Sequence, residues 1–105
     1  MKKINLAVTG CMGRMGRQII KSAKLDKNFK LVSLTEGKKI NKKISGIRID
    51  LNTEKAFKNS NLIIDFSTPK CTFQVLKIAS KLKKRVVIGT TGFSKKEEGL
   101  IKNFS

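Results

Sequence analysis

The sequence contains no histidine, tryptophan or tyrosine, and only two of its 105 residues are cysteines. Without histidine there is no triad in which that side chain activates a serine or cysteine, and without closely spaced cysteines there is no zinc motif of the usual kind. Cys11 and Cys71 lie far apart, which is typical of small apolar core residues in a reducing compartment. We therefore predict no histidine-based catalytic residue and no metal site in this chain.

Long apolar runs are also missing. The apolar stretch after Lys2 and Lys3 has only about five residues and ends in glycines, whereas a secretory signal needs an apolar core of roughly 7–15 residues. No other apolar stretch approaches the roughly 20 residues of a membrane-spanning helix. The sequence thus predicts a cytoplasmic protein without a membrane partner.

Acidic residues are scarce: seven Asp and Glu face 24 Lys and Arg, for a net charge of +17. Such a charge is typical of nucleic-acid binders, of proteins that attract an anionic cofactor or substrate, or of a lysine-rich proteome. The lysines are spread from Lys2 to Lys102 rather than clustered, only four cations are arginines, and no Trp or Tyr is present to stack on bases. We therefore predict no nucleic-acid partner.

What the chain does contain is a regular alternation of strand and helix patterns, distinguished by the spacing of their apolar residues. The expected strands cover residues 3–9, 29–35, 61–67 and 85–88. A further short strand is expected at 47–49, at the end of a mobile, lysine-rich loop over 38–48. The expected helices cover residues 13–24, 53–57, 69–82 and 94–103. Alternating strands and helices predict an α/β fold with a parallel sheet.

The fold class that we expect is a Rossmann-type doubly wound parallel sheet, incomplete at the C-terminus. Residues 1–105 would form one dinucleotide-binding domain, and a catalytic or substrate domain would be absent from this chain. The first helix is expected to bury a stripe consisting of Met15, Ile19, Ile20 and Ala23. The second strand is expected to place Phe29, Leu31 and Ser33 on one face, and the strand at 85–88 to be buried.

Gly10, Gly13 and Gly16 punctuate the junction of the first strand and helix. In this arrangement the first glycine permits a tight turn, the second lets the backbone approach a pyrophosphate, and the third lets the helix pack closely. Arg14 adds positive charge in the first helical turn. Glu36 follows Gly16 by 20 residues, at the end of the second strand, where an acid accepts hydrogen bonds from ribose hydroxyls. The pattern therefore predicts a dinucleotide site.

Two other segments remain ambiguous on residue patterns alone. Lys38 and Lys39 follow Glu36 and Gly37 and are candidates to contact a 2′-phosphate, so the sequence leaves NADH and NADPH both open. The turn over residues 89–92 is either a plain turn or a wrap around the nicotinamide ribose, and Phe66 either contacts the cofactor or packs.

Three segments carry a more specific signal: VTGCMGRMG over 8–16, IDFSTP over 64–69 and VIGTTGF over 87–93. Together with Glu36 they resemble the N-terminal, cofactor-binding part of the 4-hydroxy-tetrahydrodipicolinate reductase (dihydrodipicolinate reductase) family. The resemblance covers essentially the whole chain. It implies an NAD(P)H-dependent oxidoreductase of diaminopimelate and lysine biosynthesis, which passes hydride to a cyclic unsaturated dicarboxylate and is a cytoplasmic homotetramer.

The resemblance also implies which residues hold NADH or NADPH. It assigns the adenosine ribose to Glu36 and the nicotinamide side to Gly89, Thr90 and Thr91. The residues that it assigns to the pyrophosphate are Gly10, Cys11, Met12, Gly13, Arg14 and Met15. Many members carry Arg after the ribose-binding acid, where this chain has Gly37. The family's His-rich catalytic motif lies beyond residue 105, so the chain is expected to be a fragment that is inactive alone.

Two other functions fit parts of these observations. One is the N-terminal domain of another NAD(P)-dependent dehydrogenase, of the aspartate or homoserine type, because such enzymes share the glycine turn. The other is a small basic nucleic-acid-binding protein, which the dispersed lysines make the weaker alternative.

Overall fold

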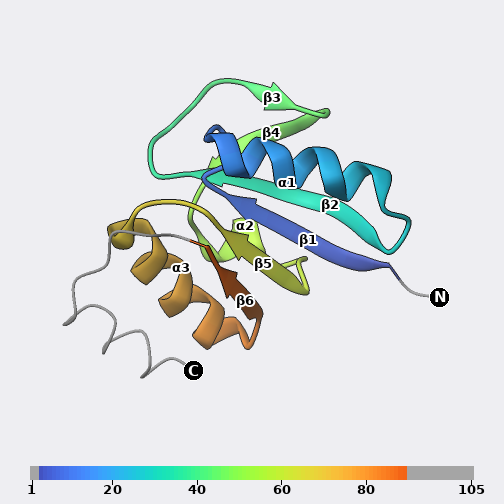
Figure 1. The fold of residues 1–105 in the computed structure, drawn as a ribbon. Coiled ribbons are helices and arrows are strands. Elements are labelled where there is room, and N and C mark those ends of the chain that lie inside the picture. The colour runs from blue at the N-terminus through green and yellow to red at the C-terminus, as the bar shows by residue number, and fades with distance from the viewer. Residues whose placement is uncertain (1–2, 90–105) are drawn as a thin grey trace.

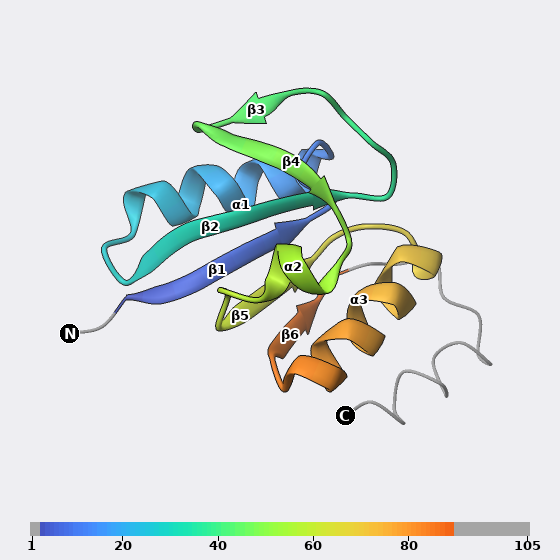
Figure 2. The same cartoon turned by 180° about the vertical axis from the view of Figure 1, so that it is seen from behind.

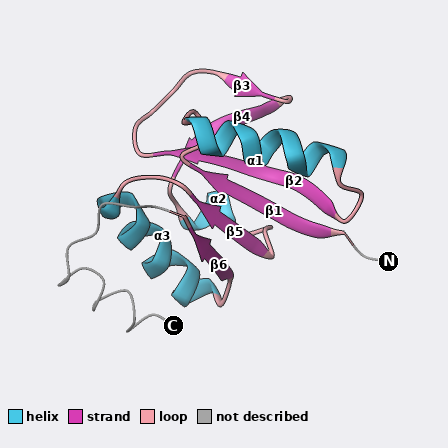
Figure 3. Ribbon diagram, viewed as in Figure 1, coloured by secondary structure: helices cyan, strands magenta, loops and turns pink. Residues whose placement is uncertain are grey.

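A computed structural model describes residues 3–89 of the chain. Its strands are β1 (Ile4–Thr9), β2 (Phe29–Glu36), β3 (Lys43–Ile44), β4 (Ile47–Leu51), β5 (Leu62–Asp65) and β6 (Arg85–Ile88). Its helices are α1 (Arg14–Leu25), α2 (Glu54–Phe57) and α3 (Pro69–Leu82) (Figures 1 and 3). The predicted alternation of strand and helix is therefore confirmed over these residues, whereas the helix predicted over 94–103 lies outside them.

The described strands form one sheet in the order β3-β4-β2-β1-β5-β6. All neighbours are parallel except β3, which pairs antiparallel with β4. From β1 the chain moves outward through β2 to β4, then returns to the other side of β1 for β5 and β6. This reversal beside β1 is the strand order of a Rossmann-type fold, so the predicted fold class is confirmed.

Helices cover both faces of the sheet, with α1 on one face and α2 and α3 on the other (Figures 1 and 2). The alternation along β1 supplies both cores, because successive side chains point to opposite faces. Leu6 and Val8 belong to the core beneath α1, whereas Ala7 packs with Phe57 and Val75 in the core beneath α2 and α3.

The buried stripe of α1 is centred one residue further along than predicted. Gly16, Ile20 and Ala23 are the buried residues of this helix, and Met15 is 45% exposed. The reason is that Gly16 rather than Met15 contacts the backbone of the preceding turn. Since neighbouring residues are about 100° apart around a helix, this rotates Met15 towards solvent.

A bulge in β2 contradicts the predicted face of Ser33. Leu6 pairs with Leu31, but the next residue, Ala7, pairs with Ser33, so that Val32 is skipped. An extra residue reverses the alternation that follows it. Ser33 consequently lies on the same face of the sheet as Ala7, and Leu31 lies on the other face.

Two further predictions are corrected at the outer strands. The expected loop over 38–48 contains a hairpin, because Ser45 and Gly46 both have positive φ, at 54° and 79°, which is typical of a two-residue turn between antiparallel strands. The strand at 85–88 is less buried than predicted: Val87 is 53% exposed, because β6 has only one neighbouring strand among residues 3–89.

The predicted start of the long helix at Pro69 is confirmed, and the short helix begins at Glu54, one residue later than predicted. The Thr53 hydroxyl accepts a hydrogen bond from the Ala56 N–H at 3.2 Å and caps α2. Thr68 caps α3 in the same way, and Pro69 occupies the first turn. None of the described helices is long and apolar enough to cross a membrane.

Candidate functional site

A groove of about 400 Å³ opens at the carboxyl edge of the parallel strands, where the chain leaves β1, β2 and β5. It is lined by Gly10, Gly13, Glu36, Gly37, Lys38, Phe66, Ser67, Thr68 and Cys71. The strand order reverses between β1 and β5, and ligands of open α/β sheets bind outside the carboxyl ends of the strands at such a reversal. The position of the groove therefore makes it the candidate site.

Gly10 and Gly16 are glycines because the backbone leaves no room for a side chain. Gly10 has φ of +64°, and a Cβ there would lie 2.0 Å from the Phe66 carbonyl oxygen. A Cβ on Gly16 would lie 2.2 Å from the Gly10 carbonyl oxygen. These contacts clamp the turn between α1 and the segment after β5, so both residues are needed by the fold itself.

Gly13 is different, because the fold does not require it to be glycine. Its φ of −74° is open to any residue, and a Cβ there would meet only the Gly10 carbonyl oxygen, at an ordinary 3.4 Å. The residue is exposed and is the N-cap of α1. Having no side chain, it leaves the N–H groups of the first turn uncapped and approachable, as an anion at a helix N-terminus requires.

Glu36 connects the end of β2 to the glycine turn. Its Oε2 accepts a hydrogen bond from the Met12 N–H at 2.7 Å, and the carboxylate is partly buried at the wall of the groove. Oε1 accepts no hydrogen bond from residues 3–89 in this arrangement, so it can still accept one from a ligand hydroxyl.

Cys11 lies in the turn, but its side chain points away from the groove. The side chain is fully buried in the core beneath α1, and the Cys11 N–H donates to the Thr35 carbonyl at 3.3 Å. Burial, and secondarily the Glu36 charge, raise the pKa of the thiol to about 11. The prediction of a small apolar core residue is therefore confirmed for Cys11, and the residue faces no ligand through its side chain.

The remaining predicted residues differ in where they lie relative to the groove. Arg14 and Met15 are exposed in the first turn of α1, beside the groove rather than among its lining residues. Gly89 follows β6, and a Cβ there would lie 2.0 Å from the Phe66 ring, so Phe66 packs against Gly89 as well as lining the groove. Thr90 and Thr91 lie outside the described residues.

The prediction that Cys71 is an apolar core residue is wrong, because the residue lies at the surface of the groove and lines it. Its side chain is half-buried, and its Sγ would be 2.7 Å from a Cβ on Gly37. The two residues are far apart in sequence and meet because the start of α3 lies beside the end of β2. Only the strand order could have revealed this contact.

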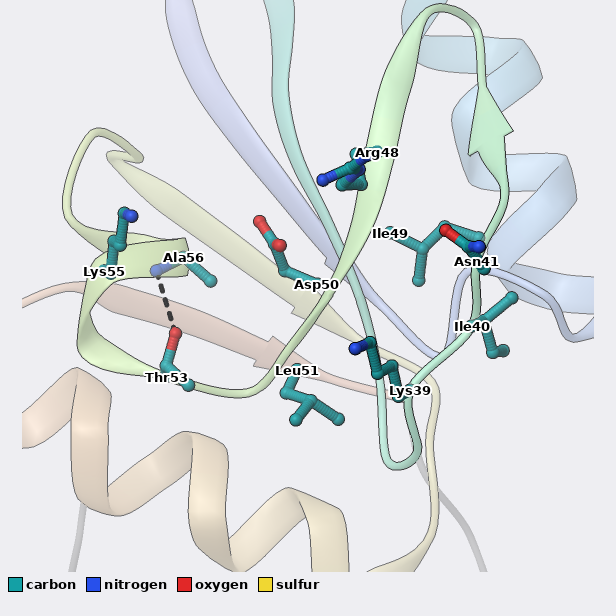
Figure 4. Close-up of a pocket in the computed structure, with 10 residues that line it drawn as sticks. All are labelled: Lys39, Ile40, Asn41, Arg48, Ile49, Asp50, Leu51, Thr53, Lys55 and Ala56. Carbon is teal, nitrogen blue, oxygen red and sulfur yellow. Dashed lines mark hydrogen bonds between the residues drawn. The ribbon is translucent and has the colours of Figure 1, made fainter.

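A larger hollow of about 490 Å³ lies beside β4 and does not include the glycine turn. Figure 4 shows it between α2, β4 and the segment at Lys39, with Arg48 and Asp50 pointing to one side of the strand. The charged residues that line it are exposed. Its volume exceeds that of the candidate site, but it does not lie at the reversal of strand order beside β1. Within residues 3–89, no group of three or more His, Cys, Asp or Glu is placed to hold a metal ion.

The parallel sheet reverses its strand order beside β1, a glycine turn lies at that reversal, and an acid ends the second strand. These features define a Rossmann-type nucleotide-binding domain. Comparison with known proteins specifies the family. The sequence profile described as "Dihydrodipicolinate reductase, N-terminus" matches residues 4–105. The chain belongs to this family. The predicted resemblance is therefore confirmed, and the alternative of an aspartate- or homoserine-type dehydrogenase is not.

Curated relatives carry the same name. A 4-hydroxy-tetrahydrodipicolinate reductase of Pelagibacter ubique (strain HTCC1062) is 69% identical over 105 residues, covering 100% of this chain and 41% of the relative. The reductase of Buchnera aphidicola subsp. Acyrthosiphon pisum (strain Tuc7) is 38% identical over 99% of the chain and 43% of its own length. The chain thus spans about two fifths of the relatives that it matches.

Solved structures agree on the fold. A dipicolinate-bound dihydrodipicolinate reductase from Paenisporosarcina sp. TG-14 matches with a TM-score of 0.78 at 23% identity, over 97% of this chain and 43% of that one. A pyrroline carboxylate reductase from Plasmodium falciparum with NADP bound matches with a TM-score of 0.64 at 18% identity, over 92% and 37%.

Proposed function

We propose that the groove binds NADH or NADPH and that the chain is the cofactor-binding part of a 4-hydroxy-tetrahydrodipicolinate reductase. The observation that carries this proposal is the hydrogen bond from Met12 N–H to Glu36. This bond connects Glu36, which is suited to bind a ribose, to the glycine turn, which is suited to bind a pyrophosphate. Both lie along the same wall of the groove.

The residues present fit such a cofactor. Gly13 leaves open a cradle that a side chain would fill, the uncapped start of α1 favours negative charge, and Arg14 adds a cation beside it. Glu36 keeps Oε1 available for a ribose hydroxyl. Gly89 and the neighbouring Thr90 and Thr91 are the proposed contacts on the nicotinamide side.

In the proposed reaction, the bound nicotinamide supplies hydride to a cyclic unsaturated dicarboxylate. The residues of this chain bind and orient the cofactor, and we assign no proton donor among them. We therefore propose that the 105-residue chain binds cofactor without turning over substrate. The cytoplasmic location, the homotetramer and the absence of a nucleic-acid partner rest on the family resemblance and composition, and they remain predictions.

A titration of the purified chain with NADH, followed by nicotinamide fluorescence, tests the proposal. The informative variant is Gly13→Ala, because its methyl group fits the fold but occupies the cradle. We expect a loss of stability of no more than about 1 kcal/mol, because alanine is a poorer N-cap than glycine. Binding should weaken at least about tenfold, since the lost contacts are charge-assisted hydrogen bonds. Gly46→Ala is the control, because that residue lies in the hairpin turn away from the groove. Equal affinities of Gly13→Ala and the unaltered chain would contradict the proposed pyrophosphate site.

The choice between NADH and NADPH is tested at two neighbouring lysines. Lys38 lines the groove, whereas Lys39 lines the separate hollow beside β4. We expect Lys38→Ala to weaken NADPH binding more than NADH binding, because only NADPH carries the 2′-phosphate, and Lys39→Ala to leave the ratio unchanged. Equal losses for the two cofactors in Lys38→Ala would show that Lys38 does not read the 2′-phosphate.

A further inference from the structure

Asp65, the last residue of β5, is a fully buried carboxylate surrounded by hydroxyl groups. Its Oδ1 accepts hydrogen bonds from the Thr9 hydroxyl and from the Ser67 hydroxyl, the latter at 2.5 Å. Its Oδ2 accepts one from the Thr72 hydroxyl. The donors come from β1, from the segment after β5 and from α3, so one side chain connects three parts of the fold.

These three parts meet directly beneath the candidate groove. Thr9 immediately precedes Gly10, and its carbonyl accepts the Phe66 N–H at 3.4 Å. The Phe66 carbonyl oxygen in turn lies against Gly10, where even one methyl group would not fit. The Asp65 carbonyl also accepts the Gly89 N–H at 2.8 Å. Asp65 thus ties the glycine turn to the start of α3 and to the end of β6.

A carboxylate is well suited to this position, because its two oxygens accept several hydrogen bonds at once. Each hydroxyl that donates to it is fixed in orientation, and its neighbouring backbone is fixed with it. Burying a charge is costly unless it is hydrogen-bonded. A buried carboxylate with these donors therefore holds the glycine turn and the start of α3 at a fixed separation. Any other separation would break hydrogen bonds to the buried charge and would cost free energy.

We propose that Asp65 is a positioning residue that sets the distance between the glycine turn and the start of α3, and hence the width of the groove. This inference rests on the proposed binding of NADH or NADPH in that groove. Neither Thr9 nor Thr72 lines the groove, so these hydroxyls act through Asp65 rather than by contacting a ligand.

Thr72 gives the sharpest test, because Val has nearly the same shape without the hydroxyl. We expect Thr72→Val to weaken NADH binding about three- to tenfold, the range over which neighbouring packed residues modulate a site. Thr72→Ser keeps the donor and should restore binding. Ser60→Ala is the matched control, because the Ser60 hydroxyl is also buried and donates to the Phe57 carbonyl at 2.7 Å, away from the groove. It should lower stability without changing affinity.

A second measurement needs no cofactor. Amide hydrogen exchange of Met12 and Gly13 should accelerate in Thr72→Val and not in Thr72→Ser or Ser60→Ala. Unchanged exchange in folded Thr72→Val, or equal loss of affinity in Ser60→Ala and Thr72→Val, would overturn the role of Asp65. If the unaltered chain binds neither NADH nor NADPH, the proposed function fails, whereas accelerated exchange in Thr72→Val would still establish that Asp65 fixes the turn.

Discussion

Gly10 and Gly13 lie three residues apart in the same turn, but different forces require them. At Gly10 the positive φ and the Phe66 carbonyl exclude any side chain. At Gly13 the backbone would accept alanine at the modest cost of a poorer N-cap, and the missing side chain leaves the first turn of α1 open to a ligand. One glycine therefore reports on the fold and the other on binding, although the two look alike in a sequence motif.

We predict that Gly10→Ala destabilises the chain far more than Gly46→Ala. Both residues have positive φ, but a Cβ on Gly46 would meet nothing within 4 Å. Gly46→Ala should therefore cost only the conformational penalty of about 1–2 kcal/mol, whereas Gly10→Ala adds a clash with backbone. Urea denaturation of both variants measures the difference. Equal losses would mean that the Phe66 carbonyl moves away at little cost.

Cys11 makes a prediction about alkaline pH. Burial raises the pKa of its thiol from 9.0 to about 11. A raised folded-state pKa means that the associated stability is fully present below pH 9 and is lost as the pH rises towards 11. We expect Cys11→Ser, which does not ionise there, to lack this loss of about 2–3 kcal/mol. Urea denaturation between pH 8 and about 11 compares the two chains, and parallel pH profiles would contradict the prediction.

At the level of secondary structure, the signals that act within a few residues were the predictable ones. The start of α3 at Pro69 follows from local chemistry, and the strands follow from alternation. The bulge that skips Val32 was not predictable, because it appears only in the pairing of β1 with β2. The same holds for the contact of Cys71 with Gly37 in the candidate site, since it depends on where the tertiary fold places the start of α3 relative to the end of β2.

The hairpin of β3 and β4 offers a stabilising change. Ser45 has φ of 54° in the first position of its two-residue turn, where asparagine is favoured before glycine. We expect Ser45→Asn to raise the free energy of unfolding by about 0.5–1 kcal/mol, as better turn residues do. Ser45→Val should lower it, because a branched side chain disfavours positive φ. Thermal unfolding separates the two variants, and a stabilised Ser45→Val would refute the turn assignment.

Across the whole molecule, positive charge is poorly compensated. The net charge is +17, and the ion pair observed among the described residues, Lys81 with Glu54 at 3.0 Å, is largely exposed to solvent. Exposed pairs contribute little to stability. Repulsion among the dispersed lysines therefore acts against the compact state, and salt should relieve it.

We predict that the melting temperature rises between about 0.01 and 0.5 M NaCl, because the screening length falls from about 30 Å to well below 10 Å. For a domain of this size, each kcal/mol gained corresponds to about 4–8 °C. Replacing two exposed lysines, as in Lys42→Glu with Lys77→Glu, should reduce this salt dependence. A melting temperature independent of salt in the unaltered chain would contradict the argument from repulsion.

The position of β1 between β2 and β5 affects how the chain folds during translation. β1 is made early, and its partner β2 follows from Phe29, but its other partner, β5, begins only at Leu62. A growing chain that ends before that residue presents one edge of β1 unpaired, and exposed apolar strand edges are sites of misassociation. The glycine turn likewise acquires its contact with Phe66 only after β5 has emerged. The ribosome therefore completes β1 to β5 before the domain has a binding groove.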